Sequence, residues 1–147
     1  MLYVLPKLYG WGNNTLIQAG KEEYNLNNME KLFNDLNDSE SYLRYTSIIK
    51  YVQYYPPRNV TTHCIYSYGI KTTNKIIFKS KKFTKIKRIE YGDGDGTVNL
   101  VSLSFCKKSK NPNLLYKLFK KKPHIDIIKS KKFIDYIIEH TQFHTQN

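Results

Sequence analysis

One short glycine-rich segment holds the residues with the clearest chemical potential. Residues 91–99 read YGDGDGTVN and place Asp93 and Asp95 between glycines, directly after an extended stretch. Such a turn presents short acidic side chains at the end of a strand with its backbone amides exposed. In α/β proteins, ligands bind and reactions take place at the carboxyl ends of strands. The segment is therefore a candidate for acid, base or cation-binding chemistry.

Four interpretations of this segment compete. A dinucleotide-binding loop fails, because two aspartates would repel a pyrophosphate and the last glycine of G-x-G-x-x-G is missing. A calcium loop of the EF-hand type begins with Asp93 and Asp95 but has Ser104 where the bidentate Glu belongs. A plain turn and the acid of a Ser-His-Asp triad remain. In α/β-hydrolases the triad acid follows a late strand, and the histidine comes later in the chain.

The cysteines and the other histidines offer few further sites. Cys64 and Cys106 are the only cysteines, and neither belongs to a C-x-x-C pair that could bind zinc. Counting alone leaves open a disulfide or two buried thiols. His63 adjoins a cysteine in an expected strand and is interpreted as structural, while His140 and His144 have zinc-like spacing without a third ligand nearby. The sequence predicts no metal and no cofactor.

Alternating helices and strands are expected to position these residues. Apolar spacing predicts helices over 25–36, 41–54 and 131–141, and a further helix within 97–105. β-branched and aromatic residues predict strands over 60–68, 75–79, 85–91 and 114–119. The core-facing residues are expected to be Met29, Leu32, Phe33 and Leu36, then Ile48, Ile49 and Val52, and finally Phe133, Ile134, Ile137 and Ile138. This alternation favours an α/β sheet.

Length and charge limit the number of domains and the classes of function that this chain can have. The 147 residues suffice for one ordinary core, so a single domain is expected. A formal charge of +12 permits an alternative function, a small basic module that binds nucleic acid or an anionic membrane. The chain is also rich in Lys, Asn, Ile, Tyr and Phe together. A genome rich in A and T would produce this composition, and with it the excess of Lys, without any selection for binding. No apolar run reaches the length of a membrane span, and residues 1–6 carry no targeting signal.

Several segments, taken in their order along the chain, together resemble one known protein family. Residues 63–69 (HCIYSYG), 91–99 (YGDGDGTVN) and 102–106 (SLSFC) resemble the C-terminal region of the lecithin:cholesterol acyltransferase family. The likeness extends upstream through LYVLPKLYGWG and LFNDL, and downstream through residues 123–128 (PHIDII). It implies that the chain is the C-terminal portion of an α/β-hydrolase fold. This portion would contain the late strands of the parallel sheet and their flanking helices, and it would be an incomplete fold on its own. Residues 1–147 would belong to one such domain. Residues 1–59 would be a helical segment leading in, and 60–142 would contain the strands, the acid loop (91–99), the His loop (123–128) and the closing helix.

The resemblance also implies roles for individual residues. Asp95, which directly precedes GTV, matches the triad acid, and His124 matches the base. Asp93 could substitute for Asp95 as the acid, but its expected role is to bond to amides of the acid loop and hold the turn. Cys64 and Cys106 match positions that form a disulfide in this family. The chain departs from the family in a shorter interval before His124, where KKKP replaces a glycine-containing approach.

The chain lacks a nucleophile elbow. Ser67 comes nearest to G-x-S-x-G, with Gly69 after it, but Ile65 stands where the first glycine belongs. In the resembled family the serine lies upstream of every matched segment. The resemblance therefore implies that an upstream portion of the same protein carries the nucleophile and that this chain alone is inactive.

The activity implied by the resemblance is that of a lipid O-acyltransferase or phospholipase acting on glycerophospholipid esters. Its partners would be a phospholipid, an acyl acceptor (a sterol, another alcohol or water) and a membrane surface, with nucleic acid not expected. Its location would be the secretory pathway, extracellular or membrane-associated.

Overall fold

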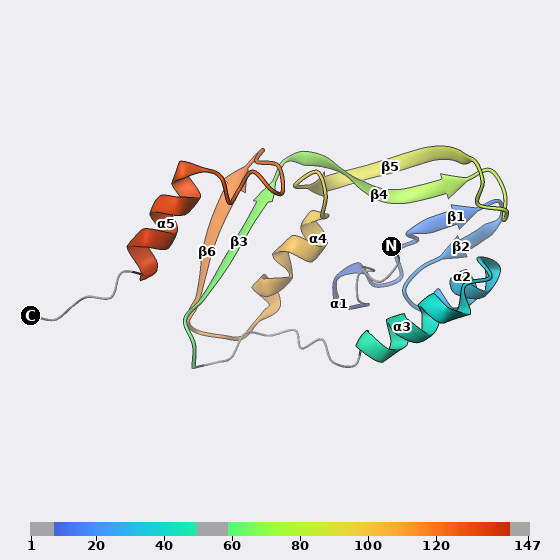
Figure 1. Ribbon diagram of the computed structural model, residues 1–147, viewed down its shortest axis with the longest axis horizontal. Coiled ribbons are helices and arrows are strands. Elements are labelled where there is room, and N and C mark those ends of the chain that lie inside the picture. The colour runs from blue at the N-terminus through green and yellow to red at the C-terminus, as the bar shows by residue number, and fades with distance from the viewer. Residues whose placement is uncertain (1–7, 50–58, 142–147) are drawn as a thin grey trace, which may run out of the picture.

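A long antiparallel hairpin links the two ends of the molecule (Figure 1). The computed structural model describes residues 8–49 and 59–141. The strands are β1 (Ile17–Ala19), β2 (Glu22–Tyr24), β3 (Thr62–Tyr68), β4 (Ile70–Phe78), β5 (Ile86–Gly94) and β6 (Leu114–Lys120). The helices are α1 (Leu8–Trp11), α2 (Met29–Asp35), α3 (Ser39–Ile49), α4 (Leu100–Leu103) and α5 (Lys131–Thr141), and a 3₁₀ turn, η1 (Ser104–Lys108), continues α4.

The described strands form two sheets, so the structure is a mixed α/β fold. One sheet has the order β2-β1-β4-β5, and the other pairs β3 with β6. β3 pairs with β6 in parallel, as expected, and β1, a strand that was not predicted, also pairs in parallel with β4. The expected parallel pairing is wrong for β4 and β5, because the short connection at 79–85 joins them as a hairpin, and a connection of this length permits only antiparallel pairing.

The main core lies at the N-terminal end of the molecule. Met29, Leu32 and Phe33 of α2 are buried there as predicted, and Leu36 packs against them. The helical segment expected over 1–59 also contains the β1–β2 hairpin, which was not predicted. Each of its strands has only three residues, and Gly20 adopts a φ of +64° in the turn between them. Strands this short carry too few residues to show an alternating pattern.

Two helices bury faces different from those expected. In α3, Ile48 is 48% exposed, and Tyr42 and Tyr45 pack their rings 5.7 Å and 6.1 Å from that of Phe33 instead. Val52 lies outside the described residues. In α5, Tyr136 is buried, whereas two of the four predicted core residues, Ile134 and Ile138, are exposed. Aromatic rings reach their neighbours from positions that an aliphatic pattern does not mark.

No helix within the described ranges is long and apolar enough to cross a membrane.

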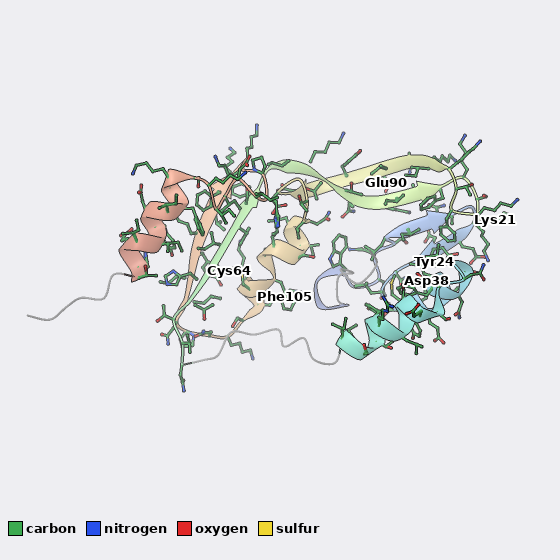
Figure 2. The ribbon with its side chains drawn as sticks, in the orientation of Figure 1. Lys21, Tyr24, Asp38, Cys64, Glu90 and Phe105 are labelled. Atoms are coloured by element: carbon green, nitrogen blue, oxygen red, sulfur yellow. A yellow bond between two sulfur atoms is a disulfide. The ribbon has the colours of Figure 1, made fainter. Side chains whose placement is uncertain are left out.

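A disulfide joins the two parts of the chain that flank the hairpin. Cys64 of β3 is bonded to Cys106 of η1, with their Cα atoms 6.3 Å apart. Cys64 and Phe105, both labelled in Figure 2, mark the two segments that the bridge joins. The bridge closes a covalent ring over a sequence separation of 42 residues, and this ring contains the hairpin and the acid loop.

We expect Cys106→Ser to lower the free energy of unfolding by about 2 to 4 kcal/mol, because the bridge restricts the unfolded chain. Urea unfolding of the parent chain and of the variant, each with and without reductant, measures the difference. Reductant should destabilise the parent and leave the variant unchanged. Equal midpoints for the oxidised parent and the variant would show that the bridge contributes no stability.

Candidate active site

The buried carboxylate of Asp95 organises the loop that follows β5. Its side chain is 1% exposed, and its Oδ1 accepts hydrogen bonds from the N–H groups of Thr97 (3.0 Å) and Val98 (2.8 Å). The Asp95 N–H donates in turn to the Val98 carbonyl at 3.1 Å. Satisfying a buried carboxylate with backbone donors offsets the cost of removing it from water. The acid loop therefore folds around the Asp95 side chain and holds it in place through these hydrogen bonds.

Glycines on either side of Asp95 permit this tight closure. A Cβ on Gly94 would lie 2.5 Å from Thr72 Oγ1 and nearer still to the Val98 carbonyl oxygen. Gly96 has a φ of +90°, which strongly favours glycine, and its N–H donates to Thr72 Oγ1 at 2.9 Å. Thr72 of β4 is itself only 1% exposed. The sequence gives no sign of its role, which depends on the pairing of β4 with β5.

His124 lies against Asp95 and is bonded to it twice. Its Nδ1 is 2.7 Å from Asp95 Oδ2, and its backbone N–H donates to the Asp95 carbonyl at 3.1 Å. An ionised carboxylate can only accept, so Nδ1 carries the hydrogen and Nε2 keeps a free lone pair. The imidazole side chain is 45% exposed, in contrast to the buried acid. The pair therefore has one oriented ring nitrogen that can take up a proton.

The acid of this pair is held in its ionised form. Burial alone would raise the pKa of Asp95, but the hydrogen bonds from two backbone amides and from His124 outweigh it. The pKa of the Asp95 carboxyl consequently lies below its ordinary value. At neutral pH the side chain is an anion that can orient an imidazole and stabilise its protonated form.

Asp93 occupies a different environment from Asp95. The sequence places it in a loop, but β5 continues through Gly94, so Asp93 lies within the strand opposite Lys71 of β4. Its side chain is exposed, and its Oδ1 accepts from the N–H of Gly69 at 2.5 Å. Asp93 thus bonds to the junction between β3 and β4 rather than to an amide of its own loop. The two carboxylates have separate partners and do not converge as the ligands of a calcium loop would.

An apolar recess of about 280 Å³, here called the site recess, opens beside the Asp95–His124 pair. Its walls come from β3, the acid loop, α4, the segment 124–128 and α5, through Ile65, Tyr66, Asp95, Leu103, His124, Ile125, Ile127, Ile128 and Phe133. Ile65 and Tyr66 are consecutive in β3, and consecutive strand residues point to opposite faces. A recess that both residues line must wrap around an edge of the strand. Since β6 occupies one edge of β3, the site recess lies at the other.

The remaining histidines do not form a metal site within the described part of the chain. No group of three His, Cys, Asp or Glu side chains there is placed to hold a metal ion. His63 Nδ1 lies 2.7 Å from the Tyr136 hydroxyl, and the His140 ring packs 4.1 Å from that of Tyr136. These contacts connect β3 to α5. His144 lies outside the described residues.

Comparisons with known proteins agree on one family. Residues 11–140 match the family "Lecithin:cholesterol acyltransferase". Lecithin-cholesterol acyltransferase-like 1 of Arabidopsis thaliana is 31% identical over 71% of this chain and 25% of its own length. Lysosomal phospholipase A and acyltransferase of Homo sapiens is 30% identical over 71% and 25%, and phosphatidylcholine-sterol acyltransferase of Gallus gallus is 26% identical over 74% and 27%.

The match covers a large share of this chain but a small share of its relatives. It covers most of this chain, including β3, the acid loop, the His loop and α5 up to its last residue but one. At the same time, the chain spans about a quarter of the length of the curated relatives it matches. On these matches, the chain belongs to the lecithin:cholesterol acyltransferase family.

Proposed function

We propose that this chain is the C-terminal portion of an α/β-hydrolase enzyme that transfers or hydrolyses the acyl groups of glycerophospholipids. Asp95 and His124 supply the acid and the base of its Ser-His-Asp triad. The contact of 2.7 Å between Asp95 Oδ2 and His124 Nδ1 is the observation that carries the proposal. It joins a buried, ionised acid to a half-exposed imidazole beside an apolar recess, which is the arrangement that nucleophilic acyl transfer needs.

The reaction proceeds in two balanced steps. His124 Nε2 removes the proton of the serine hydroxyl as the serine oxygen attacks the ester carbonyl, and Asp95 stabilises the imidazolium that forms. His124 then returns the proton to the leaving alkoxide, which departs as a lysophospholipid and leaves an acyl-enzyme. An alcohol or water attacks this intermediate, with His124 again accepting a proton and passing it to the departing serine.

An upstream portion of the same protein supplies the serine. The chain's quarter share of its relatives' length supports this proposal. So does the edge of β3 away from β6, with which no strand of the described residues pairs. Thr62 donates its N–H to the Asn113 carbonyl, and Tyr68 accepts from the N–H of Lys121, so even-numbered residues of β3 face β6. Alternate residues face opposite edges, so His63, Ile65 and Ser67 direct their backbone groups to the side of the site recess. A strand from the upstream portion pairs with this edge. Residues 1–147 and the upstream portion then form one domain, in which residues 1–59 precede the site and residues 60–142 contain it.

The substrates and the location follow the same relatives. The names of the human and chicken proteins specify a phospholipase A, an acyltransferase and a sterol acceptor. A phospholipid is therefore the acyl donor here, at a membrane surface, and a sterol, another alcohol or water is the acceptor. The Cys64–Cys106 disulfide supports a place in the secretory pathway, because disulfides persist in oxidising compartments.

The test uses the full-length protein, extended upstream to include its nucleophile. We expect it to release fatty acid from phosphatidylcholine vesicles and to transfer acyl groups to an added alcohol. His124→Gln should lower both rates by orders of magnitude, because the general base is lost. His140→Gln is the matched control and should leave both rates unchanged, since His140 packs against Tyr136 on α5. Full activity of His124→Gln, or activity of residues 1–147 alone, would contradict the proposal.

A further inference from the structure

A short, fully bonded turn carries His124 out of β6. Lys121 follows the strand with a φ of +54°, an uncommon conformation for a residue with a side chain, and its N–H donates to the Tyr68 carbonyl at 2.7 Å. Pro123 has no N–H, and the His124 N–H donates to Asp95. The remaining amide of the turn, that of Lys122, donates to the side chain of Ser67 at 3.0 Å. Among the described residues, Ser67 is therefore the one whose side chain accepts from a backbone amide of this turn.

Ser67 is built into the fold as a bridge between strand and turn. It is 0% exposed in β3, and its Oγ donates to the Phe119 carbonyl of β6 at 2.8 Å while it accepts from Lys122. One hydroxyl thus satisfies a carbonyl near the end of β6 and an amide two residues before His124. With its proton committed to a backbone carbonyl and its oxygen buried, Ser67 is not placed to act as a nucleophile.

We infer that Ser67 is a positioning residue for His124, an inference that rests on the proposed function. Removing its hydroxyl leaves the part-buried Lys122 amide and the buried Phe119 carbonyl without this partner, which is costly enough to rearrange a short turn. The backbone bonds of Lys121 to Tyr68 and of His124 to Asp95 then hold only the two ends of the turn, so its middle relaxes and shifts the imidazole relative to the Asp95 carboxylate. Misplacing a catalytic group by about 1 Å can cost about a hundredfold in rate, so a contact outside the substrate site controls the chemistry.

The direct test is nuclear magnetic resonance on the 147-residue chain labelled with ¹⁵N-histidine. The parent should show a downfield His124 Nδ1 proton bonded to Asp95, and a Lys122 amide protected from exchange. In Ser67→Ala we expect the Nδ1 resonance to be lost or moved upfield, and the Lys122 amide to exchange roughly tenfold faster or more. In the full-length enzyme the same variant should lower kcat by about tenfold to a hundredfold with KM unchanged.

Ser130→Ala is the matched control. The Ser130 hydroxyl also donates to a backbone carbonyl, that of Ile127, and accepts from a backbone amide, that of Phe133, but on the far side of His124. It should lose comparable stability without changing the His124 resonance.

Three results would overturn the inference. They are an unchanged Nδ1 resonance in Ser67→Ala, the same change in Ser130→Ala, and, if Ser67→Ala does not fold, an unprotected Lys122 amide in the parent. The resonance and exchange measurements need no activity. A full-length protein without acyltransferase activity would therefore reject the proposed function, whereas an unchanged resonance would reject only the role of Ser67.

Discussion

Asp95→Asn in the full-length enzyme is expected to lower kcat by about four orders of magnitude while the fold remains intact. The side-chain oxygen of the introduced asparagine can still accept from the amides of Thr97 and Val98, so the loop keeps its shape. The amide nitrogen of that side chain, however, replaces the oxygen that faces His124 and donates a hydrogen toward Nδ1. The imidazole then carries its own hydrogen on Nε2, where the serine proton must go. Steady-state kinetics with phosphatidylcholine vesicles, together with a circular dichroism spectrum, measure both parts of this expectation.

Asp93→Asn is the control for charge in the same segment. The Asp93 side chain is exposed and bonds to Gly69 rather than to His124, so we expect a much smaller loss of kcat. Equal losses in the two variants would mean that negative charge in the segment matters, not the contact with the imidazole. Equal retention of activity would reject the triad assignment and leave only the family membership.

Gly94→Ala is expected to reduce the free energy of unfolding by about 3 kcal/mol, near the upper end for overpacking. The added Cβ would overlap Thr72 Oγ1 and the Val98 carbonyl, which are both part of the structure that holds Asp95. Backbone cannot move aside as a flexible side chain can, so the acid loop must open. Urea unfolding compares the variant with the parent, and the variant's activity in the full-length enzyme should fall with its stability.

Gly92→Ala provides the comparison on the same strand. A Cβ at Gly92 would meet the nearest Asn74 atoms at 3.5 Å, an ordinary van der Waals distance. We therefore expect little change in stability from this variant. If both alanine variants unfold at the parent's midpoint, the close approach at Gly94 does not limit the loop.

Local sequence predicts the elements of this fold better than their partners. The α5 helix matches its predicted range, and Met29, Leu32 and Phe33 are buried as their helical spacing predicts. The β5 strand runs three residues beyond its predicted end, because pairing with β4 holds Gly92 and Gly94 extended despite their weak strand preference. Strand pairing is a contact between distant segments, so neither its direction nor its length is written in a local pattern.

The site shows the same division between local and distant information. Residue types and order single out Asp95 and His124, and the structure places them in contact across 29 residues of sequence. Thr72 and Ser67 were not predicted to support them, because a buried hydroxyl in a strand carries no sequence signal of its own. Each acts through a bond to the backbone of another segment. Only the paired strands bring those segments within reach.

The covalent ring closed by Cys64 and Cys106 changes what limited proteolysis would do to this chain. The exposed, lysine-rich turn at 79–82 lies inside the ring, and a protease that cleaves after lysine can cut there. Such a cut divides the chain into two pieces that stay joined through the two sulfur atoms. Asp95 and His124 both belong to the second piece, so cleavage at the turn would leave the acid and the base on one polypeptide.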